Sequence, residues 1–151
     1  MDSNQLVELL NKNLANMQVL YVKLHNYHWN VKGINFKPIH EMTEAYYNYF
    51  AEQYDEVAER IVQLGGKPLA TLQGYLKNAS ITEENKNEFD AKTVLSSVLS
   101  DFEQLNKNFK EISVAAGELS DVPSANIADD NVGWLEKEIW MIKASLRSII
   151  F

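Results

Sequence analysis

Two histidines and three carboxylates in the first half of the chain have side chains that can bind a metal ion. His28 and His40 are two of the three histidines in the protein, and Glu44, Asp55 and Glu59 follow them. At about 100° per residue, His40 and the three carboxylates share one stripe about 100° wide if they lie on a single helix. Imidazole nitrogens and carboxylate oxygens together predict a site for a divalent transition metal.

The residues between the two histidines predict a tight turn between two helices. Gly33 is a typical helix stop, Asn35 is a typical N-cap, and Pro38 is tolerated in the first turn of a helix. The midpoint of positions 28 and 40 is position 34, which lies inside this turn. In an antiparallel hairpin, His28 therefore faces His40.

The two distal carboxylates lie too far along the second helix to join the histidines of the same chain. At ~1.5 Å per residue, the rise from His40 to Asp55 is about 22 Å, whereas metal–ligand bonds are ~2.0 to 2.2 Å long. A second, antiparallel copy of the helix, with a two-fold axis near Tyr49 and Phe50, would bring these carboxylates to the histidines. The small side chain of Ala51 would let the helices approach. The spacing therefore predicts an intersubunit site, present twice in each dimer.

The motif around these residues is long enough to compare with known families. It reads His-Trp-Asn-Val-Lys-Gly-x-x-Phe from His28, with His40 twelve residues after His28, and continues with Asp55-x-x-x-Glu59-Arg60. This pattern resembles the ferroxidase signature of the Dps family, the miniferritins or DNA-binding proteins from starved cells. The similarity covers essentially all 151 residues.

The resemblance implies a function and a ligand set. Dps proteins are hollow dodecamers that oxidise Fe(II), usually with hydrogen peroxide, and store ferric mineral. The family pattern implies that His28, His40 and Glu44 bind iron from one subunit. It implies that Asp55 and Glu59 bind from the two-fold mate. Many members have Asp where Glu44 stands, and the longer carboxylate still supplies oxygen. A nitrogen and oxygen ligand set suits Fe(II), with Mn(II) and Zn(II) as competitors.

Aromatic residues surround the candidate ligands. His25 lies one turn before His28 without a matching carboxylate, so we expect it to pack beside the site rather than to bind metal. Trp29 adjoins His28 and could trap oxidising equivalents, although a packing role explains it equally well. For the cluster Tyr46-Tyr47-Asn48-Tyr49-Phe50, we expect core and dimer contacts in preference to a redox or nucleic-acid role.

Apolar residues at three- and four-residue steps predict four long helices. The expected ranges are about 3–32, 36–64 and 91–119, with a fourth helix from Ser124 or Ala125 to the end. The fourth is expected to bury Ile127, Val132, Leu135, Ile139, Trp140, Ile142, Leu146 and Ile149. Residues 65–90 read as a crossover with a short helix at 71–78, and Asp90 as the next N-cap. The plan is all-α: a ferritin-like four-helix bundle with a short helix in the crossover between helices 2 and 3, forming a single domain over residues 1–151.

One absence in the sequence supports a shared site. A di-iron site inside the bundle would need Glu-x-x-His motifs on the inner helices. None of the three histidines has a glutamate three residues before it. The five candidate ligands are therefore better explained by an intersubunit site than by an intrasubunit one.

Composition limits the remaining function classes. The net charge is −7, and neither terminus has a Lys/Arg-rich tail, so DNA binding is disfavoured. No segment approaches the ~20 apolar residues of a membrane span. The first residues do not resemble a secretory signal, which favours a cytoplasmic protein. Cysteine is absent, so thiolate metal sites are excluded.

An acidic segment near the junction of the third and fourth helices is a candidate route for iron. It contains Glu118, Asp121, Asp129 and Asp130. Dps cages have negatively charged three-fold pores there, so the resemblance implies Asp121, Asn126 and Asp130 as pore residues. Asn126 stands where relatives often have aspartate. Acidic residues at a helix N-terminus explain the segment equally well.

Three functions are compatible with these observations. The favoured one is an iron-storage ferroxidase in a homo-dodecamer, with Fe(II) and hydrogen peroxide or dioxygen as substrates. The second is a nucleoid-binding cage, which the acidic charge and the missing basic tail disfavour. The third is a metal-free structural bundle, which leaves the clustered ligand types unexplained.

Overall fold

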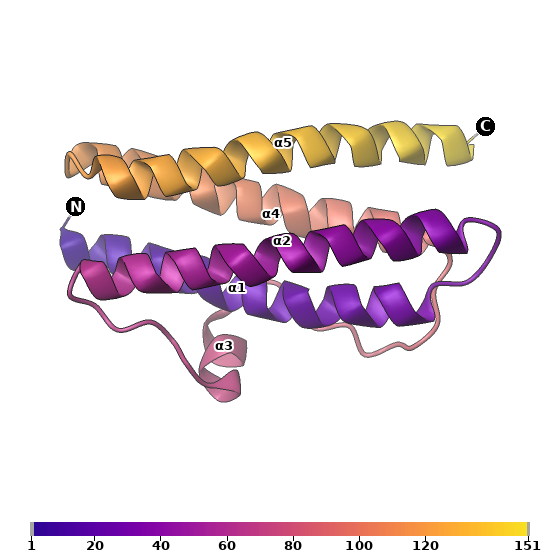
Figure 1. Cartoon of the computed structure of the whole chain (residues 1–151), viewed down its shortest axis with the longest axis horizontal. Coiled ribbons are helices and arrows are strands. Elements are labelled where there is room, and N and C mark those ends of the chain that lie inside the picture. Colours follow the sequence, from indigo (N-terminus) through magenta and orange to yellow (C-terminus); the bar gives the residue numbers. More distant parts are fainter. Residues whose placement is uncertain (1, 151) are drawn as a thin grey trace.

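The chain folds into four long helices and one short helix. A computed structural model describes the backbone of residues 2–150 and the side chains of residues 2–147. The helices are α1 (Ser3–Asn30), α2 (Phe36–Gln63), α3 (Leu72–Asn78), α4 (Ala91–Glu118) and α5 (Val122–Ile150). The long helices lie side by side, and α3 lies outside them (Figure 1). The predicted four-helix bundle with a short helix in the crossover is confirmed.

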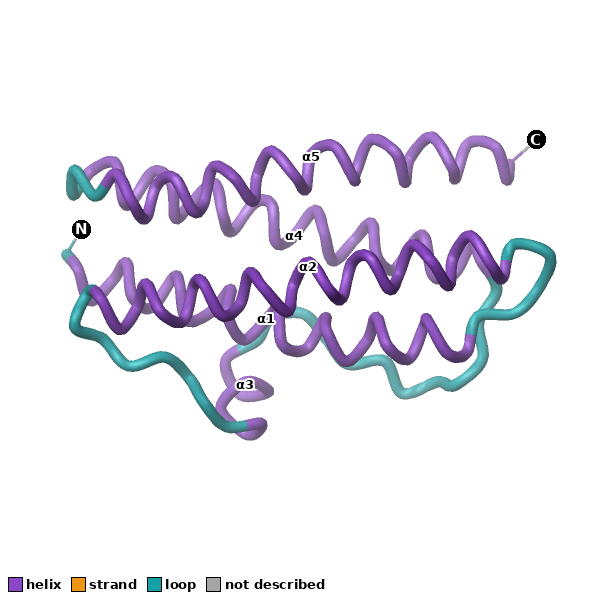
Figure 2. The backbone as a smooth tube through the Cα atoms, viewed as in Figure 1, coloured by secondary structure: helices purple, strands orange, loops and turns teal. Residues whose placement is uncertain are grey.

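Two helical hairpins and a long crossover make up the bundle. α1 pairs with α2, and α4 pairs with α5. The crossover between α2 and α4 returns the chain to the end of the bundle where α1 finishes (Figure 2). At that end Phe89 pairs with Val31 as an isolated β-bridge, and the Lys32 amide donates to the Phe89 carbonyl at 2.8 Å. The crossover therefore fastens to the α1–α2 turn, beside the two histidines.

The helices bury the stripes that their periodicity predicts. On α1 the members of the stripe are at most 1% exposed: Leu6, Leu10, Leu14, Met17, Leu20 and Leu24. Full burial of such a side chain contributes roughly 1.5–3 kcal/mol. Phe50, Phe102 and Phe109 fill the space between the hairpins and are fully buried. Packing of these stripes fixes the rotation of each helix, and thus the direction of its polar residues.

Two helix boundaries differ from the expected ones. α1 ends at Asn30 rather than at 32, because Val31 is extended and pairs with the crossover. α5 begins at Val122 rather than at Ser124 or Ala125. Asp121 accepts a hydrogen bond from the Ser124 amide at 3.1 Å, as an N-cap side chain does, and the first turn tolerates Pro123.

The predicted burial of Trp140 is wrong, because its side chain is 65% exposed. It lies about 140° around the helix from Leu135, which is in the core. Trp134 occupies the aromatic core position instead and stacks on Tyr49, with ring centroids 3.6 Å apart. The predicted burial of Ile149 falls outside the described side chains.

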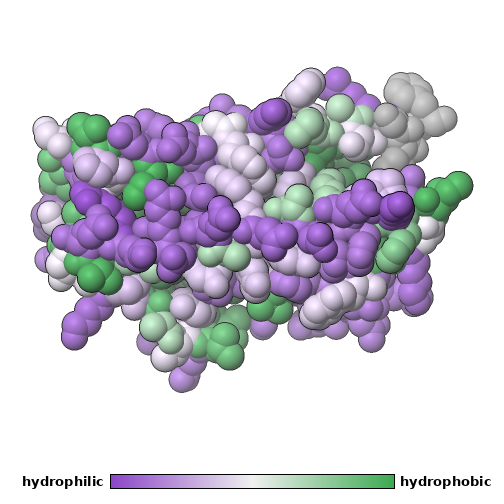
Figure 3. Space-filling view, viewed as in Figure 1, coloured by the Kyte–Doolittle hydropathy of each residue, from purple (hydrophilic) through white to green (hydrophobic). Residues whose placement is uncertain are grey.

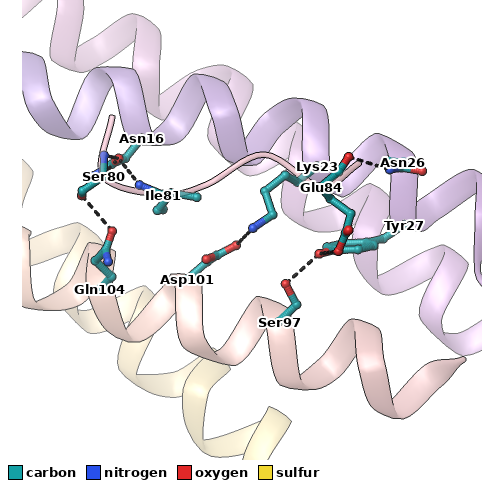
Figure 4. A network of polar contacts seen from close by, with 10 residues as sticks. All are labelled: Asn16, Lys23, Asn26, Tyr27, Ser80, Ile81, Glu84, Ser97, Asp101 and Gln104. Atoms are coloured by element: carbon teal, nitrogen blue, oxygen red, sulfur yellow. Dashed lines mark hydrogen bonds and ion pairs between the residues drawn. The ribbon is translucent and has the colours of Figure 1, made fainter. Parts of the chain in front are cut away.

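Polar side chains fix the crossover to α1 and α4 (Figure 4). The buried Asn16 carboxamide oxygen accepts hydrogen bonds from the amides of Ser80 and Ile81 at 2.7 and 3.0 Å. Lys23 of α1 forms an ion pair with Asp101 of α4, with 2.6 Å between Nζ and Oδ2. Both partners of this pair are largely buried, so the crossover covers a polar contact between the two helices.

The surface in Figure 3 is mainly hydrophilic, with apolar patches that include the region of α3. Leu72 and Leu76 of that helix are 77% and 51% exposed. Within residues 2–150, no helix combines the length and the hydropathy that crossing a membrane requires.

Candidate metal centre

The α1–α2 hairpin brings the two histidines together. Gly33 has φ = 114°, a left-handed conformation that favours glycine, and it lets the chain reverse within five residues between the helices. Asn35 occupies the N-cap position of α2 but makes no side-chain capping hydrogen bond. His28 and His40 lie opposite each other, with ring centroids 3.6 Å apart and planes 13° from parallel.

Each histidine ring is held by the backbone of the other histidine. His28 Nδ1 lies 2.6 Å from the His40 carbonyl oxygen, and His40 Nδ1 lies 2.7 Å from the His28 carbonyl oxygen. A carbonyl oxygen only accepts, so each Nδ1 carries the hydrogen and donates it. In a neutral imidazole the proton on Nδ1 leaves the Nε2 lone pair available. Metal-binding histidines commonly have such a carbonyl partner.

Neighbouring side chains restrict both rings further. Phe36 stacks on His40, with centroids 5.0 Å apart and planes 23° from parallel. The fully buried Thr43 lies with Oγ1 3.3 Å from His28 Nδ1, and its hydroxyl donates to the Ile39 carbonyl at 2.8 Å. The imidazoles are therefore oriented before any metal binds, which reduces the entropy cost of binding.

Glu44 lies next to the free nitrogen of His28. Its Oε1 is 3.8 Å from His28 Nε2, and its side chain is more than half exposed. Tyr47, one turn later on α2, has a raised pKa. Partial burial is the main cause, followed by the charge of Glu44 and a hydrogen bond with its carboxylate. Glu44 and His40 thus each lie beside His28, and the role of the three as metal ligands stays a prediction.

The structure does not place Asp55 and Glu59 beside the histidines of the same chain. Both are exposed on α2, further from the hairpin turn. Within the described part of one chain, His, Asp and Glu side chains form no group of three that could hold a metal ion. A single subunit supplies at most a partial site, and completion by a second subunit stays a prediction.

His25 and Trp29 belong to an aromatic cluster beside the site. The His25 ring stacks on Tyr47, with centroids 3.8 Å apart, and its Nδ1 donates to the Tyr21 carbonyl at 2.8 Å. Trp29 lies 5.4 Å from the His25 ring and is 67% exposed. His25 packs as expected, and the role of Trp29 stays a prediction.

The aromatic cluster on α2 has two faces. Tyr46 and Phe50 are buried in the core of their own subunit, so these two side chains do not provide the expected dimer contact. The Tyr49 hydroxyl donates to Asn131 Oδ1 at 2.8 Å. Tyr47 alone of the tyrosines at positions 46–50 contacts His28, with ring centroids 5.3 Å apart. Its position, seven residues after His40 on the same helix face, was a signal that could have identified it.

The candidate pore residues lie at the start of α5. Asp121 accepts a hydrogen bond from Ser124 Oγ at 2.6 Å and forms an ion pair with Arg60 at 2.8 Å. Burial works against ionisation of Asp121, but the hydrogen bonds from Ser124 and the charge of Arg60 outweigh it and lower the pKa. Asn126 and Asp130 are exposed on the next turns. Asp121 therefore has a structural role, and the pore assignment of all three stays a prediction.

Comparisons with known proteins identify the family to which this fold is similar. The ferritin-like domain family matches residues 7–150. The DNA protection during starvation protein of Helicobacter pylori is 43% identical, over 92% of this chain and 96% of the relative. A crystal structure of a Dps protein from Bacillus brevis superposes with a TM-score of 0.92 at 40% identity, over 97% of this chain and 99% of that chain. A Dps protein from Vibrio cholerae, described as a member of a superfamily of ferritin-like diiron-carboxylate proteins, has a TM-score of 0.92 at 34% identity, over 95% and 90% of the chains.

Proposed function

The chain belongs to the Dps family of ferritin-like proteins, and we propose that it is a miniferritin that oxidises Fe(II) and stores the ferric product. Hydrogen peroxide is the preferred oxidant in this proposal, with dioxygen as the alternative. The iron is bound at sites shared between two subunits of a hollow homo-dodecamer. A cytoplasmic location is part of the same proposal.

The paired histidines are the observation that carries this proposal. Their Nδ1 atoms are occupied by backbone carbonyls at 2.6 and 2.7 Å, which leaves two Nε2 lone pairs in stacked rings. A purely structural role for His28 and His40 would not explain why both Nε2 lone pairs are left available. Neutral imidazole and carboxylate ligands suit Fe(II). The protein therefore binds one Fe(II) mainly through His28 and His40, and Glu44 lies where it can contribute oxygen.

The partner subunit completes the site in this proposal. Asp55 and Glu59 on the exposed face of α2 supply carboxylates across a two-fold axis, so each dimer has two equivalent sites. Two Fe(II) ions then give two electrons to one molecule of peroxide, which with two protons becomes two molecules of water. The carboxylates hold the second, weaker iron. Paired delivery of electrons avoids release of hydroxyl radical.

The proposal is tested by removing the histidines. We expect His28→Gly/His40→Gly cages to sediment as the wild type but to lose rapid Fe(II) oxidation, followed by the absorbance of ferric iron after peroxide addition. His28 is 5% exposed and His40 is partly exposed, and the double variant leaves the buried stripe of α1 unchanged. An unchanged oxidation rate in intact cages would refute the assigned site.

A mixing experiment tests whether the site is shared between subunits. The variants His28→Gly/His40→Gly and Asp55→Asn/Glu59→Gln are each expected to be inactive. In a mixed dimer, one site lacks both histidines and both distal carboxylates and keeps only Glu44, whereas the other site has all five ligands. Random reassembly of equal amounts should therefore restore about a quarter of the wild-type sites. The control is a mixture of the two variants in equal amounts, each assembled into cages separately before mixing. No recovery from reassembled cages would show that the site lies within one subunit.

DNA binding is the second candidate, because the Helicobacter pylori relative is named for DNA protection during starvation. The net charge of −7 opposes it, since binding rests on positive charge that displaces phosphate counterions. We expect no retention of duplex DNA by the cage in a gel-shift assay at ~0.15 M salt. A retained complex at that salt concentration would establish DNA binding as a further activity.

A further inference from the structure

Arg60, near the end of α2, joins this helix to the start of α5. Its Nη2 atom lies 2.8 Å from Asp121 Oδ1, and its Nε donates to Ser124 Oγ at 3.0 Å. Its Nη1 donates to Gln63 Oε1 at 3.0 Å. The Arg60 side chain is 17% exposed, and Ser124 is fully buried. Each of the three guanidinium nitrogens therefore has a partner, so the direction of this side chain is fixed.

The groups that receive Arg60 are themselves held in place. Ser124 Oγ donates to Asp121 Oδ2 at 2.6 Å, and the Ser124 amide donates to Asp121 Oδ1 at 3.1 Å. The Asp121 amide donates to the Ala116 carbonyl of α4 at 2.8 Å. Arg60 thus ties α2 to a rigid junction between α4 and α5, rather than to a mobile surface side chain.

A second polar contact joins the same two helices closer to the middle of α2. Asn131 of α5 is fully buried, and its Oδ1 accepts a hydrogen bond from the Tyr49 hydroxyl at 2.8 Å. Its Nδ2 donates to Gln53 Oε1 at 3.0 Å. At about 100° per residue, Tyr49, Gln53 and Arg60 lie within about 40° of one another on α2. One polar stripe of α2 therefore faces α5.

This stripe has a fixed relation to the two distal carboxylates. Glu59 and Asp55 are exposed, and they lie about 100° and 140° around the helix from Arg60. A rotation of α2 by about 10° moves an atom at the outer radius of ~5–6 Å by about 1 Å. Metal sites tolerate deviations of only ~0.2 Å in ligand distance. The rotation of this half of α2 therefore determines whether the carboxylates can reach a metal ion.

Apolar packing and hydrogen bonding restrict this rotation to different degrees. Val57 and Ile61 are fully buried and direct one face of α2 toward the core. Apolar burial is non-directional, whereas hydrogen bonds weaken steeply when their angles change. Arg60 follows Glu59 directly in the chain, and it makes such directional contacts with Asp121 and Ser124. Its contacts restrict the rotation of α2 where the carboxylates lie.

We propose that Arg60 is a positioning residue that directs Asp55 and Glu59 toward the metal position shared with the second subunit. This inference rests on the shared metal site of the proposed function. Arg60 does not bind the metal in this role; it acts by holding α2 against Asp121 and Ser124. A purely stabilising ion pair would not favour one metal position over the other. A positioning residue should affect the weaker position, which the distal carboxylates hold, and spare the histidine position.

The test measures the two metal positions separately with Zn(II), which does not change its oxidation state. Metal-free cages are titrated with Zn(II) by isothermal calorimetry. In the wild type we expect a tight binding event, which the double histidine variant loses, and a weaker event, which the double carboxylate variant loses. Arg60→Met should weaken the second event about tenfold and change the first by less than about twofold.

Asn16→Ala is the matched control, because the Asn16 side chain also makes buried hydrogen bonds but makes them to the crossover rather than to α2. It should leave both Zn(II) events unchanged. Equal weakening of the second event in Asn16→Ala and Arg60→Met would show a general loss of stability and overturn the positioning role. An unchanged second event in intact Arg60→Met cages would overturn it as well, and so would equal weakening of both events.

Ser124→Ala provides a milder variant in case Arg60→Met does not assemble. It removes the acceptor of Arg60 Nε and leaves the Asp121 carboxylate in place. The second Zn(II) event should weaken by about two- to tenfold, as expected for the loss of one hydrogen bond. No change in intact Ser124→Ala cages would overturn the inference, and velocity sedimentation shows whether each variant remains a cage.

The wild type separates this inference from the proposed function. If its Zn(II) binding equals that of the double carboxylate variant, the shared site itself is refuted. If the wild type shows the carboxylate-dependent event and Arg60→Met shows it at full affinity, only the positioning role of Arg60 is overturned.

Discussion

Tyr27 and His28 are neighbours on α1, yet they differ in how far their polar side-chain atoms are hydrogen-bonded. Tyr27 points toward the crossover and α4, where its hydroxyl is 2.7 Å from Ser97 Oγ and donates to Glu84 Oε1 at 3.0 Å (Figure 4). Burial, and to a smaller extent the charge of Glu84, raises the pKa of Tyr27. His28 points toward α2, where Nδ1 has a hydrogen-bond partner. Among the described residues Nε2 has none, and the Glu44 carboxylate lies 3.8 Å from it.

The difference separates polar groups that stabilise the fold from those available for a ligand. On the crossover side, Lys23 forms an ion pair with Asp101, and the Asn16 side chain accepts a hydrogen bond from the crossover backbone. Removing one partner of such a buried pair leaves the other without a partner, and this greatly lowers the stability of the folded protein. On the hairpin side, the paired imidazoles keep two lone pairs directed away from their backbone partners. Changes there should affect iron chemistry more than folding.

The largest expected effect on stability comes from the buried ion pair. Lys23→Met leaves the Asp101 carboxylate buried without its cation, so we expect a loss of about 3–5 kcal/mol in the free energy of unfolding. Urea unfolding at fixed subunit concentration measures it. Lys23→Met/Asp101→Leu is the matched control and should recover most of the loss. If the double variant is as unstable as the single one, the pair is not the cause.

The same pair predicts a pH dependence. Burial raises the pKa of Asp101, although Lys23 opposes the shift. Without Lys23 the folded-state pKa rises further above the unfolded value, so the folded protein favours the protonated carboxyl. The stability of Lys23→Met should therefore fall as pH rises through that pKa, relative to the wild type. Thermal unfolding midpoints of Lys23→Met and of the wild type, measured across pH 5 to 8, test this direction. If the two midpoints change in parallel with pH, the prediction is wrong.

A smaller effect is expected at the α4–α5 junction. Asp121→Ala removes the N-cap of α5 and the partner of Arg60, and we expect a loss of about 1–2 kcal/mol. The lowered pKa of Asp121 means that its contribution is present above the unfolded pKa and is lost as pH falls through the folded one. The difference between variant and wild type in urea unfolding should shrink in acid. A constant difference would show that the charge is irrelevant.

The smallest effect is expected at Thr43, where the two kinds of polar group meet. Thr43→Val keeps the shape but removes the hydroxyl that lies 3.3 Å from His28 Nδ1. The His40 carbonyl still orients His28, so we expect a loss of about 0.5–1 kcal/mol in stability. Fe(II) oxidation should slow by less than about tenfold. A loss of oxidation as large as that of the histidine variants would make Thr43 essential to the orientation of the ring.

The sequence predicted the fold and the meeting of the two histidines because both depend on local rules. The apolar steps on α1 fixed its buried face, and Asp90 capped α4 as expected, with Oδ1 accepting from the Thr93 amide at 2.7 Å. The symmetric placement of positions 28 and 40 about a turn fixed their contact. Helical periodicity and turn chemistry act over a few residues, so they can be recognised without tertiary information.

Only the tertiary structure decided which polar atoms are matched. Nothing local shows that the two histidine backbones orient each other's rings, or that Tyr47 rather than Tyr46 faces them. The exposure of Trp140 and the pairing of Asp121 with Arg60 depend on helices far away in the chain. A helix period specifies a face, whereas the partner of each atom on that face is set by how distant elements pack against it.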